Sequence, residues 1–140
     1  MRANRSIPAY TVLPELPYPD VATAVTWLCK VFGFSERLRI ANHRVQLIVG
    51  DGAVIVVEGE VPVNGSNRCS CAVLVRVDSV DQHFERAVQF GATIIRPPTT
   101  YPFGERQYTV QDLGGHVWTF SETVADIHPQ EWGGELLVGM

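Results

Sequence analysis

Apolar and polar positions follow two periods along this chain, and the same order of periods occurs twice. Asp20 and Gly33 recur, at one common offset, as Asp78 and Gly91. The apolar residues between each pair have helical spacing, the aspartate can cap the first turn, and the glycine can end the helix. The pattern predicts two amphipathic helices, the first starting at Asp20 and the second near Asp78 or Asp81.

Each predicted helix lies among apolar runs with the length and composition of strands. One run precedes each helix and three follow it. The runs cover 7–13, 35–41, 44–50 and 53–59 in the first copy, and 69–77, 93–96, 104–111 and 115–121 in the second. In each copy the last two runs are joined by a turn that contains aspartate and glycine, residues that favour hairpins. The order β-α-β-β-β therefore occurs twice.

This order predicts an α+β fold in a single domain, residues 1–140. We divide it into a first βαβββ module (7–60), a linker rich in Pro, Asn, Gly and Ser (61–68), a second module (69–122) and a C-terminal tail (123–140). A sheet covered by one helix leaves its other face to be packed. Edge-to-edge pairing of the modules would give a cupped mixed sheet with a cleft, the usual place for a small-molecule ligand.

Composition and charge narrow the range of partners. With 46% hydrophobic and 19% charged residues, the chain is globular rather than disordered. A net charge of -4 argues against nucleic acid and anionic membrane, because both require a concentrated basic face. The first residues lack an apolar signal segment, and no apolar run has the roughly 18–20 residues that span a membrane. Since three cysteines also fit a reducing compartment, we expect a cytoplasmic protein.

Three segments carry a resemblance to a known family. They are PYPDVATAVTWLCKVFGFSERLR (17–39), PFGERQYTVQDLGGHVWTFSE (102–122) and HPQEWGG (128–134). From about Ile7 to Trp132 the chain resembles the vicinal oxygen chelate superfamily, the glyoxalase/bleomycin-resistance/dioxygenase group, and within it a small bacterial bleomycin-resistance-like subgroup. The resemblance implies paired βαβββ modules in a homodimer. It leaves the chemistry open, because the superfamily includes metal-dependent lyases, epimerases and dioxygenases as well as metal-free drug-binding proteins.

The resemblance also implies four metal-ligand positions, in the first and last strand of each module. Alignment of the two copies places them at Tyr10, near Val56, near Ala72 and at Thr119. Glu58, two residues beyond Val56, is the one carboxylate close to any of them. A divalent metal requires several convergent oxygen or imidazole donors, so we expect neither a metal nor another cofactor.

Histidines and other reactive residues do not change this expectation. The four histidines are scattered: His43 and His116 lie at turns, His83 is expected on the helix surface, and His128 can cap a helical turn at HPQEW. The sequence contains no Gly-x-Ser-x-Gly elbow and no glycine-rich phosphate loop. We therefore assign no catalytic residue.

A ligand would then be recognised by shape, aromatic contacts and a few polar groups. The loop at 99–108 is the best candidate for the rim of the cleft, while strand alternation turns Trp118 and Phe120 toward the core. Arg76 and Arg106 are candidates for binding an anionic group, and the alternative is that either pairs with Glu58, Glu105 or Asp112. The full set of predicted ligand-binding residues is Tyr10, Leu74, Arg76, Tyr101, Phe103, Arg106, Tyr108 and Thr119.

Three functions fit these features. The leading hypothesis is a metal-independent homodimer that binds and sequesters a medium-sized, partly aromatic small molecule, as relatives in antibiotic resistance do. The alternative is a lyase, isomerase or dioxygenase of the same superfamily, with or without metal, in which Glu58 or Tyr10 would act. The third is an interaction module without a small-molecule ligand. Whether the protein is an enzyme stays open at this point.

Overall fold

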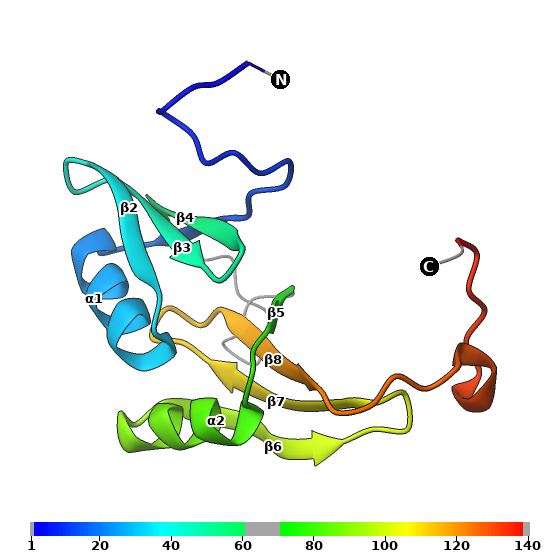
Figure 1. Ribbon diagram of the computed structural model, residues 1–140. Helices are drawn as coiled ribbons and strands as arrows, with labels where there is room; N and C mark the ends of the chain where they lie inside the picture. Colours follow the sequence, from blue (N-terminus) through cyan, green and yellow to red (C-terminus); the bar gives the residue numbers. More distant parts are fainter. Residues whose placement is uncertain (1, 61–70, 139–140) are drawn as a thin grey trace.

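The computed structural model describes residues 2–60 and 71–138, so the predicted linker at 61–68 lies outside the described residues. Two βαβββ modules follow one another (Figure 1), which confirms the α+β fold class. The first contains β1 (Glu15–Tyr18), α1 (Val21–Phe32), β2 (Ser35–Ile40), β3 (Arg44–Val49) and β4 (Gly52–Glu58). The second contains β5 (Ala72–Arg76), α2 (Val80–Gln89), β6 (Thr93–Thr100), β7 (Glu105–Gln111) and β8 (Val117–Thr123). A short 3-10 helix, η1 (Pro129–Trp132), forms at the predicted turn in the tail.

Each module forms its own four-stranded mixed sheet. The strand orders are β1-β4-β3-β2 and β5-β8-β7-β6, with the first strand of each module parallel to the last. Within the described residues the two sheets do not join edge to edge, and β1 and β5 each lie at an edge of their own sheet. No helix in the described part of the chain is both long and apolar enough to cross a membrane.

The helix ends follow local chemistry. Asp20 caps α1 by accepting a hydrogen bond from the Thr23 N–H (3.1 Å), and Gly33 ends it in the left-handed region at φ 79°. The cap of α2 is Ser79, which accepts from the Gln82 N–H (3.2 Å). The prediction of Asp78 or Asp81 at this position was wrong by one or two residues.

The first strand differs more from the prediction. The apolar run at 7–13 is not a strand, and β1 begins only at Glu15. The backbone fixes this position, since the Ile55 N–H donates to the Pro14 carbonyl (2.9 Å) and the Gly59 N–H to the Tyr18 carbonyl (3.1 Å). A strand that contains proline is tolerated because β1 is an edge strand.

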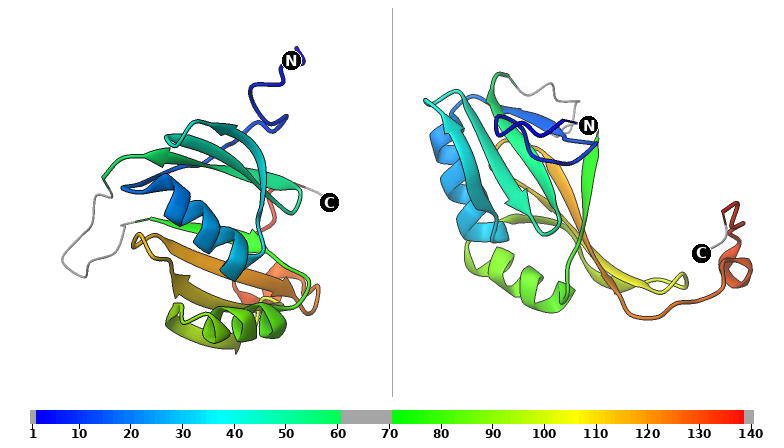
Figure 2. Two further views of the ribbon diagram at one scale, coloured as in Figure 1. Left: turned by 90° about the vertical axis from the view of Figure 1, so that its left-hand side faces the viewer. Right: turned by 45° about the horizontal axis from the view of Figure 1, so that its top comes forward.

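The run at 4–12 instead crosses the first sheet on the face away from α1. Gln46 Nε2 donates to the Ser6 carbonyl (2.7 Å), and Arg37 donates to the carbonyls of Arg5 and Ile7 (3.3 and 3.4 Å). Gln46 is only 2% exposed although it points away from the helix. The N-terminal segment therefore covers this face of the first sheet (Figure 2, right).

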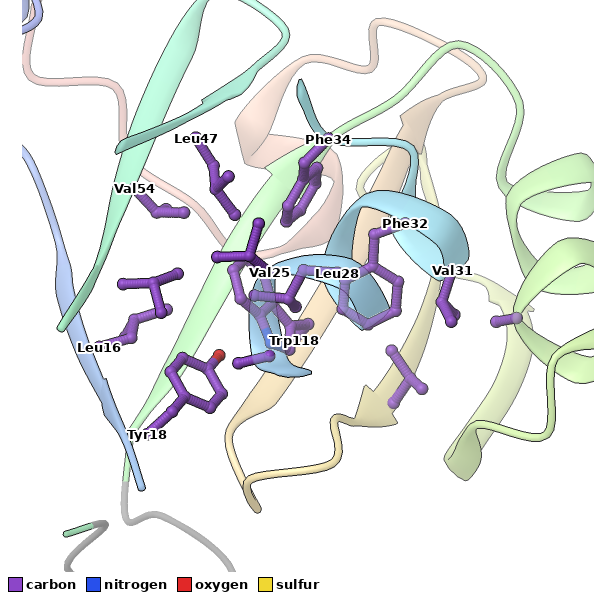
Figure 3. Close-up of a cluster of buried hydrophobic side chains, with 14 of the residues drawn as sticks. Leu16, Tyr18, Val25, Leu28, Val31, Phe32, Phe34, Leu47, Val54 and Trp118 are labelled. Carbon is purple, nitrogen blue, oxygen red and sulfur yellow. The ribbon is translucent and has the colours of Figure 1, made fainter. Parts of the chain in front are cut away.

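One hydrophobic core serves both modules (Figure 3). Figure 2 (left) shows α1 between the two sheets. At its end, Phe32 contacts the rings of Trp118 and Phe120 in β8, at centroid distances of 5.5 and 4.9 Å. The helix-covered faces of both sheets therefore share buried side chains, and their opposite faces point away from the core.

A buried carboxylate joins the modules at the turn between β7 and β8. Asp112 accepts hydrogen bonds from Tyr18 Oη (2.5 Å), from Trp118 Nε1 (3.0 Å) and from two backbone N–H groups of its own turn (2.9 Å each). The neighbouring His116 is 3% exposed and lies 2.8 Å from the Pro17 carbonyl through Nε2. This turn histidine is thus a buried link to β1.

A second joint lies between the helices. His83 of α2 contacts the Phe32 carbonyl through Nε2 (3.3 Å) and the Tyr108 hydroxyl through Nδ1, while Arg86 Nε donates to the Lys30 carbonyl (2.9 Å). The expectation that His83 is a surface residue was wrong. Burial lowers the pKa of His83 from 6.5 to about 4, so the imidazole is neutral near pH 7. Burial also raises the pKa of Tyr108 far above its ordinary value.

Candidate functional site

The face of the second sheet that points away from α2 is polar, and we call it the outer face. Strand alternation and pairing place its side chains. Leu74 in β5 pairs with Thr119 in β8, Thr119 with Thr109 in β7, and Thr109 with Arg96 in β6. The outer face includes Leu74, Arg76, Arg96, Glu105, Gln107, Thr109, Thr119 and Ser121, together with Ala72, Thr93, Gln111, Val117 and Thr123 toward the strand ends.

The centre of the outer face is a surface of hydroxyl and amide groups. The hydroxyls of Thr109 and Thr119 are 3.1 Å apart. Its one carboxylate is already engaged, because Glu105 accepts from the Ser121 hydroxyl (2.6 Å) and from the Gln107 amide (2.8 Å). Such a surface can donate and accept hydrogen bonds, and the Glu105 carboxylate is the one acidic group among its members.

Apolar and cationic groups lie at the edges of this surface. Leu74 is 60% exposed on the edge strand β5. Arg76 donates to the Thr123 hydroxyl (3.2 Å), and Arg96 donates to the Tyr101 hydroxyl (2.8 Å). Neither arginine takes part in an ion pair within residues 2–60 and 71–138. Both therefore keep N–H donors for a ligand.

Five of the eight predicted ligand residues are found on or beside the outer face. Leu74, Arg76 and Thr119 lie on it. Tyr101 and Phe103 lie in the β6–β7 loop, stacked with ring centroids 5.2 Å apart. Tyr101 is joined to the outer face through Arg96.

The other three predicted residues lie elsewhere. Tyr108 is 0% exposed and points toward α2, while Arg106 is bound to Asp81 of α2 (3.0 and 3.2 Å). The even-numbered residues of β7 face α2, so only its odd-numbered residues can contact a ligand on the outer face. Tyr10 belongs to the N-terminal segment and to no strand.

Sequence reasoning missed Gln107, Thr109 and Arg96. The first two follow from alternation along β7 once Tyr108 is known to be buried. Arg96 does not follow in this way, because β6 changes register on both sides of it. An irregular strand carries no reliable period in its sequence.

The structure also relocates the four positions at which relatives would hold a metal. Val56 is 0% exposed in the core, and Glu58 pairs with Tyr18, so both belong to the helix side of the first sheet. The side chains that point away from the helices in the first and last strands include Glu15, Ile55, Ala72, Leu74 and Thr119. Tyr10 belongs to no strand and Val56 faces the core, so neither can hold a ligand position, whereas Ala72 and Thr119 both lie on the outer face.

This set of residues does not fit a divalent metal. Leucine and isoleucine offer no donor atom, and a threonine hydroxyl is a weak ligand beside one carboxylate. Glu15 is itself paired with Arg44 at 2.7 Å. Among the described residues, no three His, Cys, Asp or Glu side chains converge as a metal site would require.

A cavity of about 960 Å³ lies where the modules meet, at the free edge of β5. Leu74 and Arg76 line one side, the β3–β4 turn at Asp51 another, and Phe34 and Phe120 its apolar part. This volume is within the range of small-molecule pockets. The outer face and this cavity thus share Leu74 and Arg76.

A sequence model of the Glyoxalase/Bleomycin resistance protein/Dioxygenase superfamily matches residues 9–120. The chain belongs to this superfamily. Among solved structures of superfamily members and similar folds, TioX from Micromonospora sp. ML1 is 36% identical, with a TM-score of 0.69 over 85% of this chain and 100% of that one. An uncharacterized protein of Mycobacterium tuberculosis H37Rv is 25% identical over 84% of this chain and 77% of its own length.

More distant structures agree in fold alone. The fosfomycin resistance protein FosX from Listeria monocytogenes is 16% identical, with a TM-score of 0.67 over 83% of this chain and 94% of that one. Membership of the superfamily and the paired-module fold are confirmed, while the homodimer stays a prediction. The ligand and any reaction have to be argued from the outer face itself.

Proposed function

We propose that this protein binds and sequesters a small, partly aromatic molecule on the outer face of the second sheet, without a metal ion. The observation that carries the proposal is that Ala72 and Leu74, beside Thr119 on the outer face, offer no donor side chain for a metal. An apolar group beside hydroxyls, with rings at one end and arginines at both edges, suits an organic ligand.

In this proposal each group has a separate role. Leu74 would contact an apolar part of the ligand, and the hydroxyls of Thr109 and Thr119 would fix its orientation. Arg76 would bind an acceptor group at the β5 edge. No bond of the ligand is broken, and one molecule is held per site in the cytoplasm. An antibiotic is one candidate ligand, in keeping with the resistance protein among the similar folds.

A second copy of the chain would complete the site. β1 and β5 are equivalent edge strands of their sheets in the described part of the chain. Pairing β1 of one copy with β5 of the other would continue both sheets into one cup, with Glu15 and Ile55 of one chain near Leu74 and Thr119 of its partner. A symmetric homodimer formed in this way has two identical sites.

Glu15 supports a second candidate function. It is a partly exposed carboxylate on β1 that points away from α1, so a lyase or isomerase of this fold could use it as a general base. Glu15→Gln separates the two functions. Loss of turnover with unchanged binding would indicate an enzyme, whereas unchanged capture of an intact ligand supports sequestration.

The proposed function is tested by calorimetric titration with aromatic antibiotics, for which we choose bleomycin, doxorubicin and mitomycin C. We expect at least one to bind, to be recovered unaltered by mass spectrometry, and to bind at least about tenfold more weakly to Leu74→Asp. Val88→Asp is the matched control, because Val88 is 50% exposed on α2. Binding that survives Leu74→Asp, or conversion of the compound, would refute the proposal.

A further inference from the structure

An aromatic cluster stands at one end of the outer face, and its third ring comes from the C-terminal tail. Tyr101 and Phe103 are stacked with planes 5° from parallel. Trp132 of η1 meets Phe103 edge to face, with ring centroids 5.8 Å apart. The tail extends past the end of the second sheet, away from both helices (Figure 1, red). Trp132 is 39% exposed there, although an aromatic ring of this size is usually buried.

The tail is held in place by specific contacts. The Gly104 carbonyl accepts from the N–H groups of Val124 (2.9 Å) and Ala125 (3.2 Å). Gly104 has φ +88°, and a Cβ at this position would lie 2.0 Å from the Ala125 carbonyl oxygen. Trp132 Nε1 also donates to the Ile127 carbonyl (3.1 Å). The position of the tryptophan is therefore built into the fold.

Next to the rings lies a pair of hydrogen-bond donors. Arg96 donates to the Tyr101 oxygen, so the hydrogen of that hydroxyl must point toward another acceptor. Arg96 keeps further N–H groups and has no carboxylate partner in the described part of the chain. Two donors from different residues, one of them charged, suit an anionic oxygen.

We propose that the ligand of the outer face is a planar aromatic compound that carries an acidic group. Its rings stack on the cluster of Tyr101, Phe103 and Trp132, and its acid accepts from Arg96 and the Tyr101 hydroxyl. This inference rests on the proposed function and adds the class of ligand to it. β5 and β6 are the opposite edges of a four-stranded sheet and lie roughly 14 Å apart. Arg96 on β6, rather than Arg76 on β5, therefore binds the acidic group of a ligand whose rings lie on the cluster.

The charge requirement is tested by titrating the full-length protein with 2-naphthoate and with its neutral isostere 2-naphthamide. The acid should bind at least about tenfold more tightly than the amide. Arg96→Gln and Tyr101→Phe should each reduce this preference by lowering the affinity for the acid alone. Arg39→Gln is the control, since Arg39 is an exposed arginine paired with Glu36 in the first module.

The stacking requirement is tested with Trp132. Trp132→Leu should weaken acid and amide by a similar factor, on the order of tenfold, and Trp132→Phe should restore most of the loss. Leu137→Ser, a change at an 85% exposed tail residue, should leave both affinities unchanged.

The outcomes separate this inference from the proposed function. Equal affinity for acid and amide, a preference that survives Arg96→Gln, or tight binding to Trp132→Leu would overturn the inference. If one of the three antibiotics still binds, and binds more weakly to Leu74→Asp, the proposed function stands although the inference about the aromatic acid fails. Silence of the protein toward both naphthalene probes and all three antibiotics would overturn both.

Discussion

Asp112 provides the most demanding test of how the modules are joined. The substitution Asp112→Asn keeps the shape of the side chain but replaces one carboxylate oxygen with an NH2 group. In the structure one oxygen accepts from two backbone N–H groups, and the other accepts from Tyr18 Oη and Trp118 Nε1. Asparagine has one oxygen, which can serve only one of these pairs.

The expected loss of stability follows from the group left without a partner. If the asparagine oxygen keeps the backbone pair, its NH2 faces the Trp118 N–H, and two donors then meet. Trp118 is 0% exposed, so water cannot replace the lost acceptor. A buried donor without a partner costs about 1–3 kcal/mol, and loss of the negative charge weakens the other bonds by about 1 kcal/mol. The total is about 2–4 kcal/mol, a large part of the roughly 5–15 kcal/mol that stabilises an ordinary domain.

Urea denaturation followed by circular dichroism measures this loss, with Asp126→Asn, an exposed aspartate in the tail, as the control. Tyr18→Phe combined with Asp112→Asn should destabilise by less than the sum of the single changes, because the two residues share one hydrogen bond. A change of less than about 0.5 kcal/mol in Asp112→Asn would refute the role of this carboxylate.

Three further predictions concern other parts of the fold. The pKa of His83 is lowered to about 4 in the folded state, so its contribution to stability is complete above pH 6.5 and is lost as the pH falls from 6.5 to 4, by up to about 3 kcal/mol. His83→Gln should remove this pH dependence in urea titrations, and an unchanged profile of stability against pH would contradict the role of His83. Gly104→Ala should release the tail and speed its removal in limited proteolysis, whereas Gly50→Ala, with nothing within 4 Å of the new Cβ, should not. Ser79→Ala should cost about 1 kcal/mol and Asp78→Asn almost nothing, and the reverse order in thermal melts would return the cap of α2 to Asp78.

The parts of the fold that depend on local chemistry could be predicted from the sequence. Asp20 and Gly33 mark the ends of α1 because a cap needs only a few neighbouring backbone groups. The hairpin between β7 and β8 likewise follows from aspartate and glycine at its turn. Duplication of this local order was enough to indicate two modules.

The parts that depend on distant partners could not be predicted. β1 is only four residues long, and its position is set by pairing with β4. The more apolar segment before it lies against the face of the first sheet that points away from α1. An error of this kind moves the first-strand ligand position, so Tyr10 is not part of β1 and Glu15 is. His83 was misjudged for the same reason, since its partner Phe32 lies in the other module.

The central claim is that a ligand is held by the outer face without a metal. It is tested most directly by titrating the tightest-binding aromatic compound into protein treated with EDTA, and again after addition of Mn²⁺ or Ni²⁺. The account predicts the same Kd in both titrations, because Ala72, Leu74 and Thr119 do not provide the convergent donors that a metal requires. Loss of binding after EDTA treatment, restored by either ion, would contradict it.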